Sequence, residues 1–134
     1  MEYMTRFEFL RSLLPSLMFN SFKDSQQPNE QPIEQLSLVK LIANPEKYDD
    51  KMILVDGFLR LEREGDVLYL HEEDYKYHLF KNGIWVVQND LLMTKAGDLS
   101  NKYVTLVGTF GCRFKGHRSI TSGSLNDITA AHLA

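Results

Sequence analysis

Two nine-residue segments of this sequence match each other position by position. Residues 51–59 read KMILVDGFL and residues 102–110 read KYVTLVGTF, so a lysine, alternating apolar residues and a glycine fall at the same offsets. Apolar residues at every second position predict β-strands. A glycine inside a strand weakens it and is therefore expected where the strand bends sharply. We expect the two segments to be bent strands that hold equivalent places in a β-barrel.

Three further short strands are expected around these two, each bounded by turn residues. The predicted strands are Met52–Glu62, Val67–His71, Ile84–Gln88, Tyr103–Cys112 and a strand within Ser119–Ile128. Ser37 is a predicted N-cap for a short helix over Leu38–Ala43, which Pro45 ends. A helical turn is predicted within residues 89–100. The sequence thus predicts a mostly β fold, a five-stranded barrel with short helices, over residues 37–134.

The region before the barrel divides into two parts. Residues 1–23 carry Phe7, Leu10 and Leu13 at helical spacing, which predicts an N-terminal amphipathic helix. The alternative is a degenerate export signal, because Thr5–Arg11 resembles a twin-arginine frame with Phe7 in place of the second arginine. Residues 24–36 are polar, contain two prolines and lack apolar periodicity, so they are expected to be a linker.

Charge and cysteine content limit the choice of partners and compartments. The net charge of −3 disfavours nucleic acid as the main partner, since a phosphate backbone is held largely by lysine and arginine. Cys112 is the single cysteine, so no intrachain disulfide forms, which fits a reducing compartment. We expect a cytoplasmic protein, or a periplasmic one if the degenerate export signal is functional. The apolar stretches are too short to span a membrane.

The strand order, the strand glycines and the short element before the fourth strand resemble an OB-fold, a five-stranded Greek-key barrel. The segments around Asn44-Pro45, Tyr48–Lys51 and Lys102–Phe110 are similar to those of small bacterial proteins with OB-like domains. The resemblance covers about residues 38–129. Asp50 departs from the pattern, because glycine is commoner at that position. The resemblance implies the fold but not the ligand, since such barrels bind oligonucleotides, oligosaccharides and proteins.

Aromatic and acidic side chains gather around the second and third predicted strands and the long connection Glu72–Gly83 between them. We predict that a protein partner binds here, with aromatic anchors and an acidic rim. The predicted partner-binding residues are Tyr69, Glu72, Glu73, Asp74, Tyr75, Tyr77 and Trp85. The competing interpretation is that these aromatic residues close the end of the barrel as part of the core.

A basic cluster lies at the predicted hairpin tip before the fifth strand. It consists of Arg113, Phe114, Lys115, His117 and Arg118. Basic residues beside an aromatic ring suit single-stranded nucleic acid. A solvated hairpin tip and a patch that meets an acidic protein partner are the two alternatives.

No catalytic, cofactor or metal motif appears in the sequence. His71, Glu72, Glu73 and Asp74 with His78 lack the paired spacing of a zinc site, and no partner motif activates Cys112. We therefore expect no catalytic residue, no metal and no cofactor. The predicted function is a non-catalytic binding module for a protein, of the immunity or inhibitor type. The alternative is an OB-fold binder of single-stranded nucleic acid or oligosaccharide.

Overall fold

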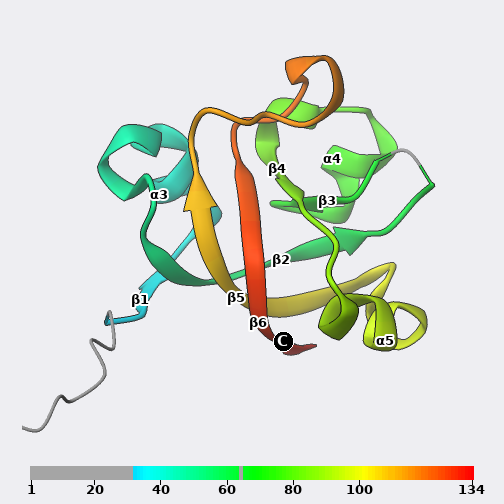
Figure 1. Cartoon of the computed structure of the whole chain (residues 1–134). Helices are drawn as coiled ribbons and strands as arrows, with labels where there is room; N and C mark the ends of the chain where they lie inside the picture. The colour runs from blue at the N-terminus through cyan, green and yellow to red at the C-terminus, as the bar shows by residue number, and fades with distance from the viewer. Residues whose placement is uncertain (1–31, 64) are drawn as a thin grey trace, which may run out of the picture. The chain divides into compact units, whose positions relative to one another are not determined.

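The computed structural model describes residues 32–63 and 65–134, which form a closed five-stranded β-barrel with one additional strand outside it (Figure 1). The predicted mostly β, five-stranded barrel is thereby confirmed, and it is compatible with an OB-like domain. The predicted helix or export signal over residues 1–23 lies outside the described residues. The strands are β1 (Glu34–Leu36), β2 (Met52–Arg60), β3 (Val67–Tyr69), β4 (Gly83–Val86), β5 (Lys102–Gly111) and β6 (Ser124–Leu133).

The barrel closes because the long strand β2 pairs on both of its sides. The order β2-β3-β4-β6-β5 returns to β2 through the antiparallel β2–β5 pair. The β4–β6 pair is parallel, whereas β2–β3, β3–β4 and β5–β6 are antiparallel. The outside strand β1 runs parallel to β2 along Ile53–Val55. Residues 34–36, the end of the predicted linker, therefore belong to the barrel unit.

Six short helical elements of the described residues connect or cover the strands. They are α3 (Leu38–Ala43), the 3₁₀ helix η1 (Pro45–Tyr48), α4 (Glu72–Lys76), the 3₁₀ turn η2 (Phe80–Asn82) and α5 (Asp90–Leu99), with a further 3₁₀ turn, η3 (His117–Ser119), near the end. Ser37 caps α3 as expected, since its hydroxyl accepts a hydrogen bond from the Lys40 amide. Asn89 caps α5 in the same way through Leu92. Buried Leu92 and Leu99 fasten α5 to the barrel end.

Apolar side chains form two clusters, one on each face of the β2–β3–β4 part of the sheet. The barrel interior holds Ile53, Val55, Leu59 and Leu68 with Leu106, Phe110 and Leu125 and further buried residues. The outer cluster consists of Phe58, Val67 and Tyr69, with Tyr75, Phe80 and Trp85 packed against them. Alternation along the strands produces this division, because successive side chains point to opposite faces.

The two matching sequence segments pair with each other across the β2–β5 ladder. Val55 lies opposite Leu106, and these two residues are also equivalent positions of the motif. Asp50 and Asn101, which precede the motifs, both have a positive φ, 59° and 65°. The Asp50 amide donates to the Phe110 carbonyl, and the Asn101 amide donates to the Leu59 carbonyl. The pair therefore has local two-fold symmetry, and the left-handed backbone at position 50 is a conformation that glycine adopts without strain.

The strand glycines are required by close approach of neighbouring strands. A Cβ atom at Gly57 would lie 2.6 Å from the carbonyl oxygen of Tyr69, and one at Gly108 would lie 2.7 Å from that of Asn126. Both contacts are with backbone, so the neighbour cannot move aside without disturbing a strand. The glycines thus allow β3 and β6 to cross close to the two bent strands.

The largest difference in strand bounds concerns the fifth predicted strand. It was expected within Ser119–Ile128, whereas β6 runs from Ser124 to Leu133. Arg118 and Ser119 have positive φ angles of 58° and 54°, and Gly123 has a φ of 153°. Two consecutive residues with positive φ turn the chain away from an extended path, so it forms a loop until Ser124. No helix within the described residues is long and apolar enough to cross a membrane.

Candidate binding surface

Helix α4 covers the outer aromatic cluster with the side chain of Tyr75. The Tyr75 ring centroid lies 5.8 Å from that of Tyr69 and 6.3 Å from that of Phe58. The Tyr75 hydroxyl donates a 2.9 Å hydrogen bond to Glu62, and the Arg60 guanidinium lies 4.9 Å from the Tyr75 ring centroid. Tyr69 is 3% exposed, and burial raises the pKa of its hydroxyl to about 12. This half of the predicted site is therefore packed as a small second core.

The acidic residues of α4 are in two different environments. Asp74 is buried and accepts hydrogen bonds from the His71 amide at 2.8 Å and from the Asn82 side chain at 2.9 Å. Glu72 is partly exposed and Glu73 exposed. Tyr77, one residue beyond the helix, is 72% exposed. Asp74 thus holds the loop together, whereas Tyr77 and the two glutamates can meet a partner.

Trp85 lies on the outer face of β4 beneath the loop that joins β5 to β6. Its ring centroid lies 6.4 Å from that of Phe114 and 5.8 Å from that of His117, with interplanar angles of 73° and 82°. Phe114 is 52% exposed. Together these rings border a surface hollow of about 520 Å³, which we call the Trp85 hollow. Its lining includes Arg63, Trp85, Gln88, Phe114, His117 and Arg118.

Gly116 holds the loop directly against the Trp85 ring. Its φ is 74°, and a Cβ atom there would lie 2.1 Å from Cε3 of Trp85. The rest of the loop is tied down by hydrogen bonds to the barrel. The Lys81 ammonium donates to the Ser119 carbonyl at 2.8 Å, and the Ser122 hydroxyl donates to the Lys81 carbonyl at 2.6 Å. The Trp85 hollow is therefore built by fixed backbone contacts.

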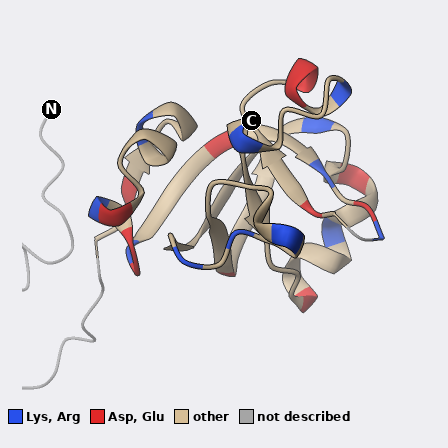
Figure 2. Ribbon diagram, turned by 90° about the horizontal axis from the view of Figure 1, so that it is seen from above, with Lys and Arg blue, Asp and Glu red and all other residues tan. Residues whose placement is uncertain are grey.

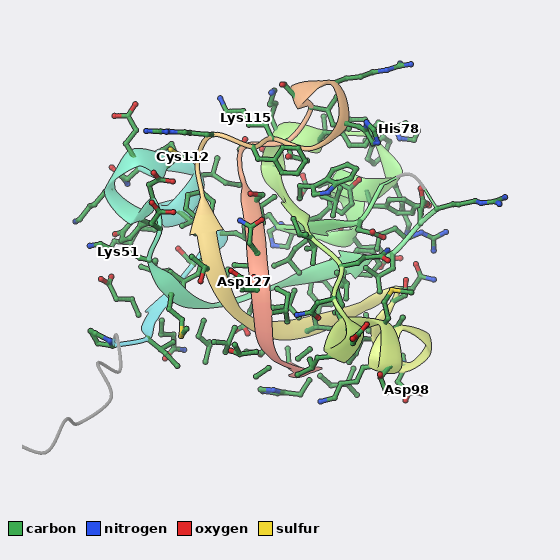
Figure 3. All side chains as sticks on the ribbon, in the orientation of Figure 1. Lys51, His78, Asp98, Cys112, Lys115 and Asp127 are labelled. Atoms are coloured by element: carbon green, nitrogen blue, oxygen red, sulfur yellow. The ribbon has the colours of Figure 1, made fainter. Side chains whose placement is uncertain are left out.

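The basic cluster divides between two sides of this loop. Arg118, His117 and Phe114 line the Trp85 hollow. Arg113 and Lys115 line a separate hollow with Glu46, Asp49 and Cys112; Cys112 and Lys115 lie at the same end of the barrel (Figure 3). The pKa of Asp49 is lowered, first by the hydrogen bond from the Cys112 amide and also by the Arg113 charge. Arg113 and Lys115 thus line a hollow with carboxylates instead of the Trp85 hollow.

The cations at the Trp85 hollow have no acidic partner in the described part of the chain. No carboxylate there lies within 4.0 Å of a charged nitrogen of Arg63 or Arg118, whereas Arg60 is paired with Glu62 at 2.8 Å. Elsewhere on the barrel, residues of both charges are interspersed (Figure 2). The two guanidinium groups are therefore available to an anionic group of a ligand.

One carboxyl group also lies at the Trp85 hollow. Asp66 is buried, and it accepts hydrogen bonds from the Glu62 amide at 3.1 Å and from the Gln88 side chain. Burial raises the pKa of Asp66, and the hydrogen bonds from Gln88 and Glu62 oppose that effect. Its oxygen atoms are occupied by these donors, so it shapes the wall of the hollow.

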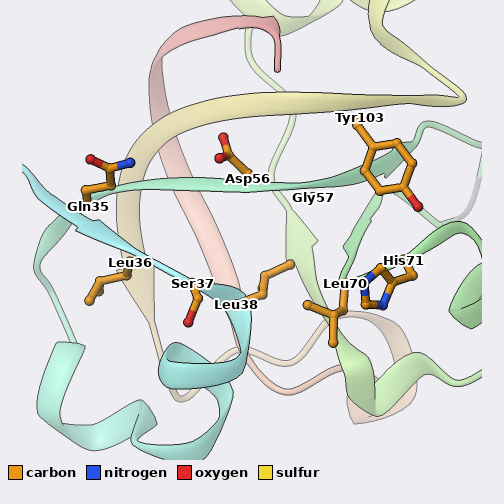
Figure 4. Close-up of a pocket in the computed structure, with 9 residues that line it drawn as sticks. All are labelled: Gln35, Leu36, Ser37, Leu38, Asp56, Gly57, Leu70, His71 and Tyr103. Carbon is orange, nitrogen blue, oxygen red and sulfur yellow. The ribbon is translucent and has the colours of Figure 1, made fainter.

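A second hollow, of about 610 Å³, lies where β2 is left without a neighbouring strand on one side (Figure 4). β1 covers residues 53–55 of β2 and β3 covers residues 58–60, so Asp56 and Gly57 lie between them. The side chains of His71 and Tyr103 border this opening. The Tyr103 hydroxyl accepts a hydrogen bond from the Glu72 amide at 3.1 Å. The hollow is open, and its lining includes Leu36, Leu38 and Leu70 beside the polar side chains.

The described residues hold no cluster of three or more His, Cys, Asp or Glu side chains that could bind a metal ion. Among the carboxylates of the described residues, Asp74 alone lies within 4.0 Å of a ring nitrogen of His71. Cys112 is partly buried, and burial together with Asp49 raises the pKa of its thiol. A raised pKa leaves less of the reactive thiolate at neutral pH.

No protein-family model matches this sequence, and no curated protein matches it. Among solved structures, the chain is similar to a crystal structure of a protein assigned as an aspartyl-tRNA synthetase from Leishmania major Friedlin. The two share 12% identity over 88% of this chain, with a TM-score of 0.45. The match spans 25% of that protein's length. At this identity and TM-score, the likeness says nothing about what this chain binds.

Two residues of the Trp85 hollow could not be found by sequence reasoning. Arg63 precedes the expected turn at Glu64–Asp66, and Gln88 ends the third expected strand, but no local motif marks either of them. The contact between Trp85 and the basic loop joins residues about thirty positions apart along the chain. Only the parallel β4–β6 pairing brings that loop over β4.

Proposed function

We propose that this chain is a non-catalytic binding module whose partner is a protein, and that the partner anchors at the Trp85 hollow. The observation that carries the proposal is the joint presence around one hollow of Trp85, exposed Phe114 and two guanidinium groups that pair with no carboxylate of residues 32–63 and 65–134. Tryptophan and arginine are enriched among the residues that dominate binding energy at protein interfaces. The volume of about 520 Å³ lies within the usual range of ligand sites.

The side-chain chemistry supports a binding role over a catalytic one. A nucleophile needs a base within hydrogen-bond reach and a lowered pKa. The pKa of the Cys112 thiol is raised instead. His117 packs edge-on against Trp85 and has no acidic partner within 4.0 Å among the described residues.

A second protein-binding surface is supported by Tyr77 on the far side of α4. Its 72% exposure beside Glu72 and Glu73 provides an aromatic anchor with an acidic rim, which suits a basic partner. An immunity or inhibitor protein that neutralises a basic toxin would use this surface. The alternative of a single-stranded nucleic acid or oligosaccharide ligand would use the Trp85 hollow.

Site-specific photocrosslinking in the source cell tests the proposal. p-Benzoylphenylalanine in place of Phe114 is expected to capture one protein reproducibly. The same amino acid in place of Met93 is the matched control, because Met93 on α5 is 51% exposed and Phe114 is 52% exposed. A third position, Tyr77, tests the α4 surface. Equal capture at positions 114 and 93, or none at 114 and 77, would count against a protein-binding role.

A further inference from the structure

We propose that the Trp85 hollow binds an acidic peptide segment of the partner, one that carries an apolar side chain among its carboxylates. This rests on the proposed function and names the chemistry of the bound segment. The charge of this segment agrees with the interpretation of the basic cluster as a patch that meets an acidic protein partner, and it is opposite to that of the basic partner expected for the acidic rim. Arg63 and Arg118 are exposed at this hollow, whereas its one carboxyl group, Asp66, is buried and hydrogen-bonded, so the segment bound here is anionic.

The two arginines determine which anion fits. Arg63 comes from the connection after β2, and Arg118 comes from the loop before β6, so they reach the hollow from different elements. Each guanidinium presents a planar fork that matches one carboxylate with two parallel hydrogen bonds. Two carboxylates on one peptide satisfy both forks. Phe114 and the outer edge of Trp85 then offer an apolar contact for the side chain between them.

Nucleic acid fits this surface less well because the basic cluster is divided. Affinity for a phosphate backbone grows with the number of phosphates that cations neutralise. Arg113 and Lys115 lie on the Asp49 side of the loop, so the cations form no continuous track across Trp85. One face of the Trp85 ring is also covered by Gly116, which leaves less room for a stacked base. A net charge of −3 further opposes a long polyanion.

The structure offers an intrinsic probe of binding, because Trp85 is the only tryptophan in the sequence. The full chain is titrated with a short peptide of glutamate and aspartate that carries phenylalanine at every fourth position. The same peptide with lysine at the acidic positions and an oligothymidylate of similar length are titrated in parallel. We expect a saturable change in Trp85 emission with the acidic peptide alone, weakened by added salt because the contacts lie at the surface.

Matched arginine variants separate a specific site from bulk charge. Arg118→Gln and Arg63→Gln are each expected to weaken acidic-peptide binding by at least about fivefold, since each removes one charge-assisted contact. Arg113→Gln removes the same charge from the other side of the loop and should leave the affinity within about twofold. Circular dichroism and melting temperatures show whether each variant remains folded.

Each outcome decides the proposal. An equal loss in Arg113→Gln and Arg118→Gln means that net charge alone drives binding and overturns the assignment. Tighter binding of oligothymidylate than of the peptide, with the same arginine dependence, assigns the hollow to nucleic acid instead. An unchanged Trp85 emission on addition of the acidic peptide also overturns the proposal. In that last case the wider protein-binding function stands or falls separately, on the crosslinking at Phe114.

Discussion

Gly116 lies flat against the indole of Trp85, so close that no side chain larger than hydrogen fits between them. This contact joins the loop before β6 to the outer face of β4, and it positions Phe114 and His117 on either side of Gly116 around the ring. The shape of the Trp85 hollow therefore depends on Gly116. Its φ of 74° is a second reason for glycine at this position, because other residues rarely adopt that backbone conformation.

Gly116→Ala is expected to lower stability by about 1–3 kcal/mol, because the new methyl group meets the Trp85 ring and the left-handed backbone is strained. The emission of Trp85 should shift to longer wavelength as the loop moves away and water reaches the ring. Gly97→Ala is the control. A Cβ atom at Gly97 in α5 meets nothing within 4 Å, so this change should raise stability by up to about 1 kcal/mol through helix propensity. An unchanged emission spectrum in Gly116→Ala would contradict the contact.

Tyr75 and Tyr77 are two positions apart and are expected to respond differently to alanine. Tyr75→Ala removes a ring packed on Phe58 and Tyr69 and should cost about 1–3 kcal/mol. Tyr77→Ala removes an exposed ring and should stay within about 0.5 kcal/mol of the parent. Chemical denaturation of both variants measures the difference. Equal losses would mean that α4 packs on the barrel with a different face.

Gly57→Val and Gly108→Val are each expected to destabilise the barrel by about 1–3 kcal/mol. The cause is the close approach of a backbone carbonyl, 2.6 Å from a Cβ at Gly57 and 2.7 Å from one at Gly108. Because the two glycines are equivalent positions of the β2 and β5 motifs, their losses should be similar in size. A neutral melting temperature in either variant would show that its neighbouring strand can move aside.

Glu62 makes the stability of the fold sensitive to acid. Hydrogen bonds from Arg60 and then from Tyr75 lower the pKa of Glu62 below its ordinary value of 4.5. A carboxyl group with a lowered pKa in the folded state stabilises the protein fully above its unfolded pKa, and that contribution disappears as the pH falls through the folded pKa. Between about pH 6 and pH 3, Glu62→Gln should therefore lose less free energy of unfolding than the parent does.

The contribution of Asp66 to stability is expected to change with pH in the opposite direction, so Asp66 serves as the control for this pH experiment. Burial raises the pKa of Asp66, so its ionised form costs stability above the folded pKa, and acid relieves that cost. Asp66→Asn should consequently lose more stability on acidification than the parent. Urea unfolding as a function of pH measures both slopes. If the free energy of unfolding changed equally with pH in the parent, Glu62→Gln and Asp66→Asn, the pKa values of Glu62 and Asp66 would be the same in the folded and unfolded chains.

The barrel could be predicted from the sequence because its main signals are local. The alternation in residues 51–59 and 102–110, the Ser37 cap and the glycines each depend on a few neighbouring residues. The start of β6 was misplaced because the positive φ angles of Arg118 and Ser119 belong to residue types that seldom adopt them. Nothing in the local sequence marks such residues as left-handed.

The candidate site was harder to predict because it depends on contacts between distant segments. The sequence placed Trp85 with the aromatic residues of α4 and treated the basic loop as a separate patch. In the structure Trp85 packs against the outer cluster together with Tyr75, and the loop residues Phe114 and His117 contact Trp85 in addition. A sequence lists which side chains are aromatic or basic, whereas the barrel topology decides which of them share a surface.

The symmetry of the β2–β5 pair has a consequence for self-recognition. The two motifs share the offsets of their lysine and glycine, and at the centre of their antiparallel register Val55 faces its equivalent, Leu106. A surface that complements its own copy through a two-fold axis is the kind that joins identical subunits in a homodimer. The barrel thus contains within one chain a contact of the kind that two identical half-barrels would make.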